Sequence, residues 1–193
     1  MSKPVLQIII ASTRPGRIGL PVAQWFEQAA IAQGGFEIEV VDLAEVKLPF
    51  LDEPNHPRLR QYVHQHTLDW SATIDRADAY VIVTPEYNYG FNGVLKNALD
   101  FLSQEWAHKP VGFVSYGGVA AGTRAVQLLK PVLGSLKMTV ASGAVNIPFV
   151  TQFRDEEGRI QPNDVMTAAA DAMLVELEVL VRVLEPLRTQ SIH

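Results

Sequence analysis

The residues with the clearest chemical potential lie near the start of the chain, where an apolar run at 5–11 leads into Ser12-Thr13-Arg14-Pro15-Gly16-Arg17-Ile18-Gly19. The apolar run predicts a buried strand, and a helical pattern follows the loop. Free backbone N–H groups and the helix dipole favour an anion at a helix N-terminus. Because that dipole disfavours cations, Arg14 and Arg17 indicate that a bound anion offsets their charge. The loop therefore predicts a phosphate site; the alternative is an ordinary helix cap with solvated arginines.

The composition bounds the class of protein. The chain has 193 residues, of which 48% are hydrophobic and 19% charged, which predicts one globular domain over residues 1–193. The formal net charge of −5 argues against a general affinity for nucleic acid or anionic membranes. The absence of cysteine excludes disulfides, thiolate nucleophiles and Cys-ligated metals. Any redox chemistry must therefore come from a cofactor.

No secretory leader pattern opens the sequence, and no apolar run is long enough to span a membrane. We therefore expect a cytoplasmic protein that does not bind membranes.

Strand and helix patterns alternate along the chain. The expected strands cover 5–11, 36–40, 79–84, 110–115 and 139–145, and the glutamates of the second strand suit a sheet edge. Helices are expected at 18–29, 68–77, 93–102, from Gly122 onward and at 165–184. We expect Pro131 to kink or split the fourth helix and Pro186 to end the last one. Five strands interleaved with helices predict an α/β fold, a three-layer, doubly wound parallel sheet.

Ligands of such sheets bind outside the carboxyl ends of the strands, where the strand order reverses. Three loops follow apolar strands, at 12–19, 85–90 and 115–118, and we expect them on one edge of the sheet. In the second loop, Tyr87 offers a flat face and Asn88 a paired donor and acceptor. The third loop is small enough for its backbone to approach a ligand ring closely. Each loop alone could be an ordinary turn, but together they predict a site for a phosphorylated, flat ligand.

These motifs resemble those of the NADPH-dependent FMN reductase family, which has the flavodoxin-like fold. Residues 11–19 resemble its FMN phosphate loop, although Ala11 stands where members often carry Gly. The segment Pro85-Glu86-Tyr87-Asn88-Tyr89-Gly90, with Gly93-Val94-Leu95-Lys96-Asn97, is similar to its most diagnostic motif, and Ser115-Tyr116-Gly117-Gly118 to its third flavin loop. The resemblance covers residues 5 to about 149 and implies five strands in the order 2-1-3-4-5.

The resemblance also implies FMN as the cofactor and NADPH or NADH as the co-substrate, with electrons passing to a small-molecule acceptor in the same slot. The residues implied to hold the FMN phosphate are Ser12, Thr13, Arg14, Arg17, Ile18 and Gly19. Those implied around the isoalloxazine and ribityl chain are Pro85, Glu86, Tyr87 and Asn88 on one side, and Ser115, Tyr116, Gly117 and Gly118 on the other. Because the flavin carries the chemistry, no catalytic protein residue and no metal are predicted.

Other candidate sites are weaker. His64 and His66 are two residues apart, so a helix would point them to different faces, which favours solvated histidines, with His56, over a metal site. The run Asp155-Glu156-Glu157 predicts a turn. Ser12 lacks the pattern around a hydrolytic nucleophile. The apolar stripe of the helix at 165–184 predicts core or a subunit interface.

Two other functions remain open on the sequence alone. One is a flavodoxin-like electron carrier with a protein redox partner, whose usual sign is a strongly acidic surface; the other is a non-redox phosphate binder. FMN is favoured over FAD because no second pyrophosphate motif is present. The physiological acceptor and the choice between NADPH and NADH stay open.

We also expect a homodimer or homotetramer. The family resemblance supports this expectation, and so does the aromatic content at Tyr89, Phe91, Phe101 and Trp106. The alternative is that these aromatics belong to the core of a monomer.

Overall fold

The protein is built on one parallel sheet. The computed structural model describes residues 3–190. Its strands are β1 (Val5–Ile10), β2 (Glu37–Asp42), β3 (Ala79–Pro85), β4 (Pro110–Tyr116), β5 (Thr139–Val140) and β6 (Val145–Ile147). They lie in the order β2-β1-β3-β4-β5, with β6 also paired with β4. The predicted doubly wound sheet and its strand order are confirmed, and the glutamate-bearing strand β2 lies at the edge.

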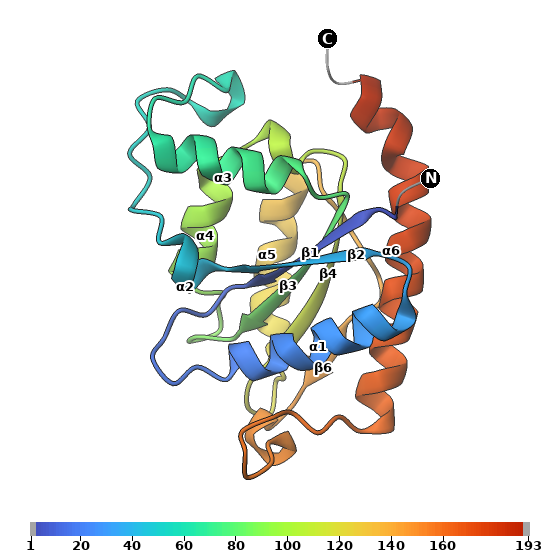
Figure 1. Ribbon diagram of the computed structural model, residues 1–193. Coiled ribbons are helices and arrows are strands. Elements are labelled where there is room, and N and C mark those ends of the chain that lie inside the picture. Colours follow the sequence, from blue (N-terminus) through green and yellow to red (C-terminus); the bar gives the residue numbers. More distant parts are fainter. Residues whose placement is uncertain (1–2, 191–193) are drawn as a thin grey trace.

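Helices cover both faces of the sheet (Figure 1). One face carries α1 (Gly19–Gln33) and α6 (Asp164–Gln190), and the other carries α3 (Gln65–Asp75), α4 (Gly93–Asp100) and α5 (Thr123–Ser135). The shorter elements are α2 (Leu43–Val46) and the 3-10 turns η1 (Pro57–Leu59), η2 (Gln104–Trp106) and η3 (Val150–Phe153). The three layers follow from the apolar residues that β1, β3 and β4 place on both sheet faces.

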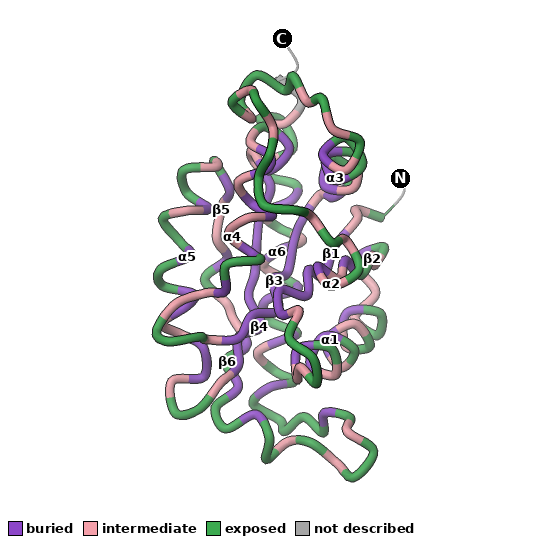
Figure 2. Tube along the Cα trace, turned by 90° about the vertical axis from the view of Figure 1, so that its left-hand side faces the viewer, coloured by how far each residue is buried: buried purple, intermediate pink, exposed green. Residues whose placement is uncertain are grey.

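The central strands belong to two hydrophobic cores. All residues of β3 and β4 are buried, as the continuous purple tube at the centre of Figure 2 shows. Along β3, Val81 and Val83 face the core under α1 and α6, while Tyr80 and Ile82 face the core under α3, α4 and α5. This alternation is the expected geometry of a strand covered on both faces.

The aromatic residues that had indicated a subunit boundary do not all lie at the surface. Phe101 and Trp106 are completely buried in the core under α3, α4 and α5. The Tyr89 ring, in contrast, is 67% exposed. For Phe101 and Trp106 the interpretation as interface residues was therefore wrong, and the alternative, core packing, holds.

The last predicted strand, 139–145, is divided in two. The N–H of Ala141 still donates to Val111 O at 2.9 Å, but the next two residues leave the ladder. The N–H groups of Ser142 and Gly143 each donate to the Glu176 carboxylate of α6, at 2.8 Å. A side chain from the final helix thus replaces β4 as the hydrogen-bond partner, which a local sequence pattern does not reveal.

Neither proline interrupts its helix as expected: Pro131 does not split α5, and Pro186 does not end α6. Helix α5 continues through Pro131, and α6 continues through Pro186. Both prolines are exposed, so water can solvate the carbonyl that each one leaves without a helical donor. Arg188 anchors the end of α6, since its guanidinium donates to Asp78 O at 3.0 Å and pairs with the Asp78 carboxylate. Despite the length of α6, no helix within residues 3–190 is long and apolar enough to cross a membrane.

Gly122 holds the turn between β4 and α5 in a conformation that a side chain would disrupt. Its φ is 80°, and a Cβ atom there would lie 2.8 Å from Tyr116 N and 2.9 Å from Ser115 Cβ. We expect Gly122→Ala to lower the free energy of unfolding by about 2–3 kcal/mol, because left-handed strain and overpacking add.

Gly34→Ala is the matched control for this substitution. Gly34 has a φ of 82°, but its nearest atom beyond the adjacent residues would lie 4.0 Å from the new Cβ. Strain alone predicts a loss of about 1 kcal/mol there. Urea unfolding of both variants measures the difference, and equal losses would show that the contact with the β4 backbone costs nothing.

Candidate active site

The three predicted loops meet in one cleft at the carboxyl ends of β1, β3 and β4. The cleft has a volume of about 350 Å³. It lies where the strand order reverses between β1 and β3, which is where this fold class binds ligands. Its lining residues are Ser12, Arg14, Gly16, Arg17, Ile18, Pro85, Glu86, Tyr87, Tyr116, Gly117, Val150 and Thr151.

The loop between β1 and α1 supplies donors for an anion. Within 12–18, the hydrogen bonds of the described chain use only one backbone donor, the N–H of Arg17, which bonds to Arg14 O at 3.0 Å. The other amide groups of the loop, Pro15 excepted, remain free to bind an anion beside the N-terminus of α1. Gly16 has a φ of 69° and no atom within 4 Å of where its Cβ would be. The loop is therefore open on the cleft side and rich in donors.

The two arginines of this loop have different surroundings. Arg14 is exposed. Arg17 forms an ion pair with Asp42, at the end of β2, and both side chains are only about 15% exposed. Asp42 thus supplies part of the negative charge that the sequence had assigned to a bound anion. The Nε of Arg17 is buried without a hydrogen-bond partner in the described structure, so the guanidinium retains a free donor.

The loop after β3 places Tyr87 in the wall of the cleft through a tight turn. Tyr87 and Gly90 exchange two backbone hydrogen bonds, at 2.8 and 2.9 Å, and Asn88 and Tyr89 between them both have positive φ. This is the geometry of a primed hairpin turn. The Tyr87 hydroxyl hydrogen-bonds to Ser12 Oγ at 3.0 Å, which joins the first loop to the second.

Glu86 is held from outside the cleft. Its carboxylate forms an ion pair with Arg124, and the Arg124 guanidinium stacks 3.8 Å from the centroid of the Tyr89 ring. The second carboxylate oxygen, Glu86 Oε2, is buried and has no partner in the described structure. Arg124 and Tyr89 therefore fix the side of the turn that faces away from the cleft, and the free oxygen is available to a ligand donor.

The third loop brings two residues that the sequence analysis missed. Gly117 N donates to Ile147 O at 3.2 Å, and Val150 N donates to Gly117 O at 3.3 Å. These bonds place Val150 and Thr151 in the cleft wall. The signal was present, because this segment follows a strand that ends at the same edge of the sheet. It was missed because the last strand was expected to end at Val145, which is the first residue of β6.

Five predicted residues do not line the cleft: Thr13, Gly19, Asn88, Ser115 and Gly118. Two of them have a structural role instead. Ser115 is fully buried and its hydroxyl bonds to Ala121 O and Asn146 Oδ1. A Cβ at Gly19 would lie 2.6 Å from the Tyr116 hydroxyl. Gly19 therefore makes room for Tyr116, the buried ring whose hydroxyl pKa is raised by burial and which stays protonated at neutral pH.

The remaining sequence candidates fall outside this cleft. His64 precedes α3 in an extended conformation, so the helical spacing argument was wrong: its ring stacks on that of His66 at 5.2 Å, and both face Asp52. In the part of the chain described, 3–190, no group of three His, Asp or Glu residues could hold a metal ion. Asp155 lies in the predicted turn, where it accepts from the N–H of Arg159 at 2.8 Å.

Comparison with known proteins agrees with this geometry. The model of the family described as NADPH-dependent FMN reductase matches residues 5–152. The chain belongs to the NADPH-dependent FMN reductase family. It is 40% identical over 163 residues to the NAD(P)H-dependent FMN reductase C4B3.06c of Schizosaccharomyces pombe, covering 82% of this chain and 80% of that one. The FMN-dependent NADPH-azoreductase of Staphylococcus saprophyticus is 27% identical over 130 residues, covering 67% and 69%.

Among solved structures, the flavoenzyme NAD(P)H:(acceptor) oxidoreductase FerB from Paracoccus denitrificans superposes with a TM-score of 0.75 at 18% identity, covering 93% of this chain and 98% of that one. This likeness confirms the flavodoxin-like fold. Family membership confirms the predicted activity, an FMN-dependent NAD(P)H oxidoreductase, and the predicted cofactor and co-substrate. It also favours a reductase over the electron carrier that the sequence had left open.

Proposed function

We propose that this reductase holds FMN in the cleft between the three loops and reduces small, flat acceptors such as quinones and azo compounds. The observation that carries the proposal is the convergence of two kinds of group in one cleft. Free amides and two arginines lie at the β1–α1 loop, and two tyrosine rings, Tyr87 and Tyr116, lie beside it. An anionic tail next to a flat ring system is the ligand that matches this arrangement.

The phosphate end of the cleft fits FMN. The free amide groups of 12–18, the unpartnered Arg17 Nε and the exposed Arg14 would bind the phosphate through charge-assisted hydrogen bonds. Asp42 holds Arg17 in place, so little side-chain entropy is lost on binding. These residues bind and orient the cofactor; none of them takes part in electron transfer.

The ring end of the cleft fits a flat heterocycle. When bound, FMN accepts a hydride from the nicotinamide and delivers electrons to the acceptor. The protein's own contribution is positioning: Tyr87 and Tyr116 border the ring position, and Arg124 holds Glu86, whose buried free oxygen can accept a hydrogen bond from a ring N–H. Val150 closes part of the wall with apolar surface, which excludes water there. No side chain is needed as an acid or base.

The cofactor and acceptor assignments are tested on the purified protein. Mass spectrometry of the released cofactor is expected to show FMN at one per chain, and stoichiometric FAD would contradict the proposal. Anaerobic addition of NADPH or NADH should then bleach the flavin absorbance, and a quinone or an azo dye should restore it. A flavin that is reduced but not reoxidised by either acceptor class would leave the reductase assignment intact and reject the acceptor proposal.

We also propose that the protein is a single domain in the cytoplasm and assembles as a homodimer or homotetramer with the flavin near a subunit boundary. Large apolar side chains on the segments that follow β2, β3 and β4 are exposed, including Phe50 at 90%, Tyr89 at 67% and Val119 at 77%. A neighbouring subunit would bury this surface and complete the slot for the acceptor. Light scattering that gives the mass of a monomer at micromolar concentration would contradict this assembly.

A further inference from the structure

A second, larger cavity lies at the amino ends of the strands, whereas the flavin cleft lies at their carboxyl ends. Its volume is about 810 Å³, and its walls come from η1, η2 and the C-terminal ends of α3, α5 and α6. Two pairs of lining residues directly precede strands, 77–78 before β3 and 108–109 before β4, and a third pair, 136–137, is separated from β5 by one residue. We call this space the amino-edge cavity. Nothing in the flavin chemistry makes use of it.

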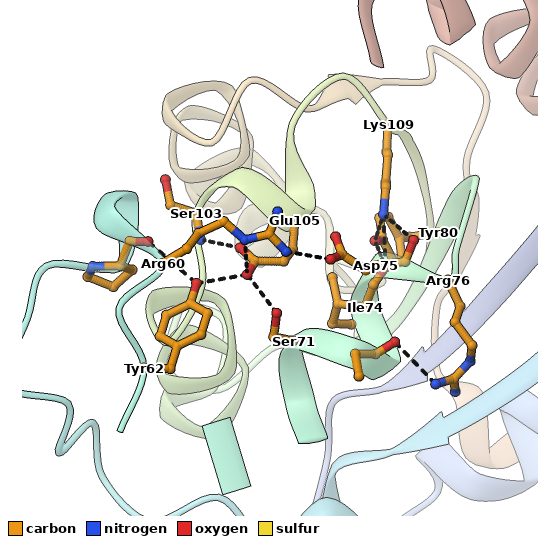
Figure 3. A network of polar contacts seen from close by, with 12 residues as sticks. Arg60, Tyr62, Ser71, Ile74, Asp75, Arg76, Tyr80, Ser103, Glu105 and Lys109 are labelled. Atoms are coloured by element: carbon orange, nitrogen blue, oxygen red, sulfur yellow. Dashed lines mark hydrogen bonds and ion pairs between the residues drawn. The ribbon is translucent and has the colours of Figure 1, made fainter. Parts of the chain in front are cut away.

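The most buried acid of the amino-edge cavity is fully occupied by internal donors. The Glu105 side chain has no exposed surface. Its carboxylate accepts from Tyr62 Oη at 2.8 Å, Ser71 Oγ at 2.7 Å and Ser103 N at 3.2 Å, and it pairs with Arg60 at 3.2 Å (Figure 3). These four donors occupy the lone pairs of the carboxylate, so Glu105 is not available to bind a ligand cation.

The other two acids of the cavity are also in ion pairs, although Asp75 shares Arg60 with Glu105. Asp75 forms an ion pair with Arg60, and Asp78 forms one with Arg188. The buried Lys109 caps the C-terminal end of α3. Its ammonium donates to Ile74 O at 2.9 Å, and to Asp75 O and Tyr80 Oη at 3.2 Å (Figure 3). Burial lowers the pKa of Lys109 to about 8. The nearby negative charge of Asp75 raises this pKa but does not offset the effect of burial.

Three basic side chains in the wall have no such partner. Within residues 3–190, the side chains of Arg58, His108 and Lys137 form neither an ion pair nor a hydrogen bond. The wall therefore carries a surplus of positive charge in a chain whose formal net charge is −5. Such a surplus, held where every nearby acid is already paired, attracts anions.

The backbone of the wall is held in uncommon conformations. Arg60, His108 and Lys137 have φ values of 50°, 59° and 60°, in the left-handed region that side chains disfavour. The N–H of His108 donates to Lys137 O at 2.9 Å, which fixes these two basic residues side by side. Arg60 and Lys137 adopt this conformation as C-terminal caps, because their N–H groups donate to Pro57 O at the end of η1 and to Gly134 O at the end of α5. These caps fix the positions from which the basic side chains extend.

We propose that the amino-edge cavity binds a small phosphate-bearing molecule, with Arg58, His108 and Lys137 as the groups that receive the phosphate. A phosphate dianion requires more than one cationic donor, and Arg and Lys in a shared wall supply them. The volume exceeds what inorganic phosphate alone needs, and Ser103 and Gln104 in the same wall are polar, so an attached sugar fits the lining. This proposal is independent of the proposed flavin site.

The test is calorimetric titration of the FMN-loaded protein with ribose 5-phosphate at low salt, where bound FMN keeps the probe off the β1–α1 loop. Arg58→Ala and Lys137→Ala are each expected to weaken binding about tenfold, the effect of losing one charge-assisted hydrogen bond. Lys47→Ala is the matched control. Lys47 is likewise exposed, with a φ of 53°, but does not line the cavity, and its substitution should leave the affinity unchanged.

Inorganic phosphate and ribose complete the experiment. Phosphate is expected to bind more weakly than ribose 5-phosphate, and ribose is expected not to bind measurably. If phosphate binds as tightly as ribose 5-phosphate, the free ion is the ligand of the same three residues. The proposal is overturned if ribose 5-phosphate does not bind, if ribose binds as well, or if Lys47→Ala weakens binding as much as Lys137→Ala. FMN content and NADPH oxidation by Lys137→Ala should equal those of the wild type, so failure here is distinguishable from failure of the flavin assignment.

Discussion

Replacing Glu105 with Ala is expected to destabilise the folded protein by about 3–5 kcal/mol, the range for removing one partner of a buried ionic network. The Glu105 carboxylate is the common acceptor for Tyr62, Ser71, the N–H of Ser103 and Arg60. In the variant, the hydroxyl of Ser71 and the N–H of Ser103 lose their acceptor at a site with no exposed surface. Buried donors left without a partner cost more than the hydrogen bond itself contributed.

Two further variants sharpen this measurement, which is urea unfolding of the FMN-free protein. Glu105→Gln keeps one oxygen for Tyr62, Ser71 and Arg60 but turns an NH₂ group toward the N–H of Ser103, so its loss should be smaller, about 1–3 kcal/mol. Glu156→Ala removes an exposed glutamate and should change stability by less than about 0.5 kcal/mol. A loss for Glu105→Ala no larger than that of Glu156→Ala would mean that the network in Figure 3 contributes nothing to stability.

The fold was largely predictable because its signals are local. The unbroken apolar runs at β3 and β4 indicated buried parallel strands, and the alternation of acidic and apolar residues at β2 indicated an edge. The topology then followed from the family resemblance, and the position of the cleft from the rule that ligands of such sheets bind at the carboxyl ends of the strands.

The features that were missed depend on contacts between distant segments. The division of the last strand requires Glu176 of α6 to bind Ser142 and Gly143, and the Glu105 network joins residues from three separate segments. The persistence of helix through Pro131 depends on solvent exposure, which a proline motif does not encode. One missed contact was within reach of the sequence: Ile10 pairs with Asp42 in the parallel register of β1 and β2, so an acid at the end of β2 lies beside the loop that carries Arg17.

Replacing Arg14 or Arg17 with Ala is expected to weaken FMN binding by roughly 1.5–3 kcal/mol each, the range for a charge-assisted hydrogen bond to phosphate. Both residues line the cleft at the β1–α1 loop, and Arg17 keeps an unpartnered Nε there. The double variant should therefore lose about 3–6 kcal/mol if the two contributions add. Lysine at either position should recover only part of the loss, because an ammonium cannot present the planar fork of a guanidinium.

The two single variants should differ in their stability without FMN. Arg17→Ala leaves the Asp42 carboxylate without its ion-pair partner, and the side chains of both residues are about 15% exposed. We therefore expect the flavin-free protein to lose about 1–3 kcal/mol for Arg17→Ala. Arg14→Ala should be neutral or slightly stabilising, because it removes an exposed cation near the N-terminus of α1.

Fluorescence quenching with FMN and with riboflavin separates the contribution of the phosphate to binding from that of the ring. Riboflavin lacks the phosphate, so its weaker binding should barely change in either variant. Arg182→Ala is the control: it removes a 75% exposed arginine on α6 and should change neither the FMN affinity nor the riboflavin affinity. If FMN and riboflavin affinities fall by the same factor, the arginines support the ring pocket or the fold, and the phosphate does not bind at the β1–α1 loop. A loss confined to FMN would instead mean that this loop binds the phosphate although Asp42 already pairs with one of its two cations.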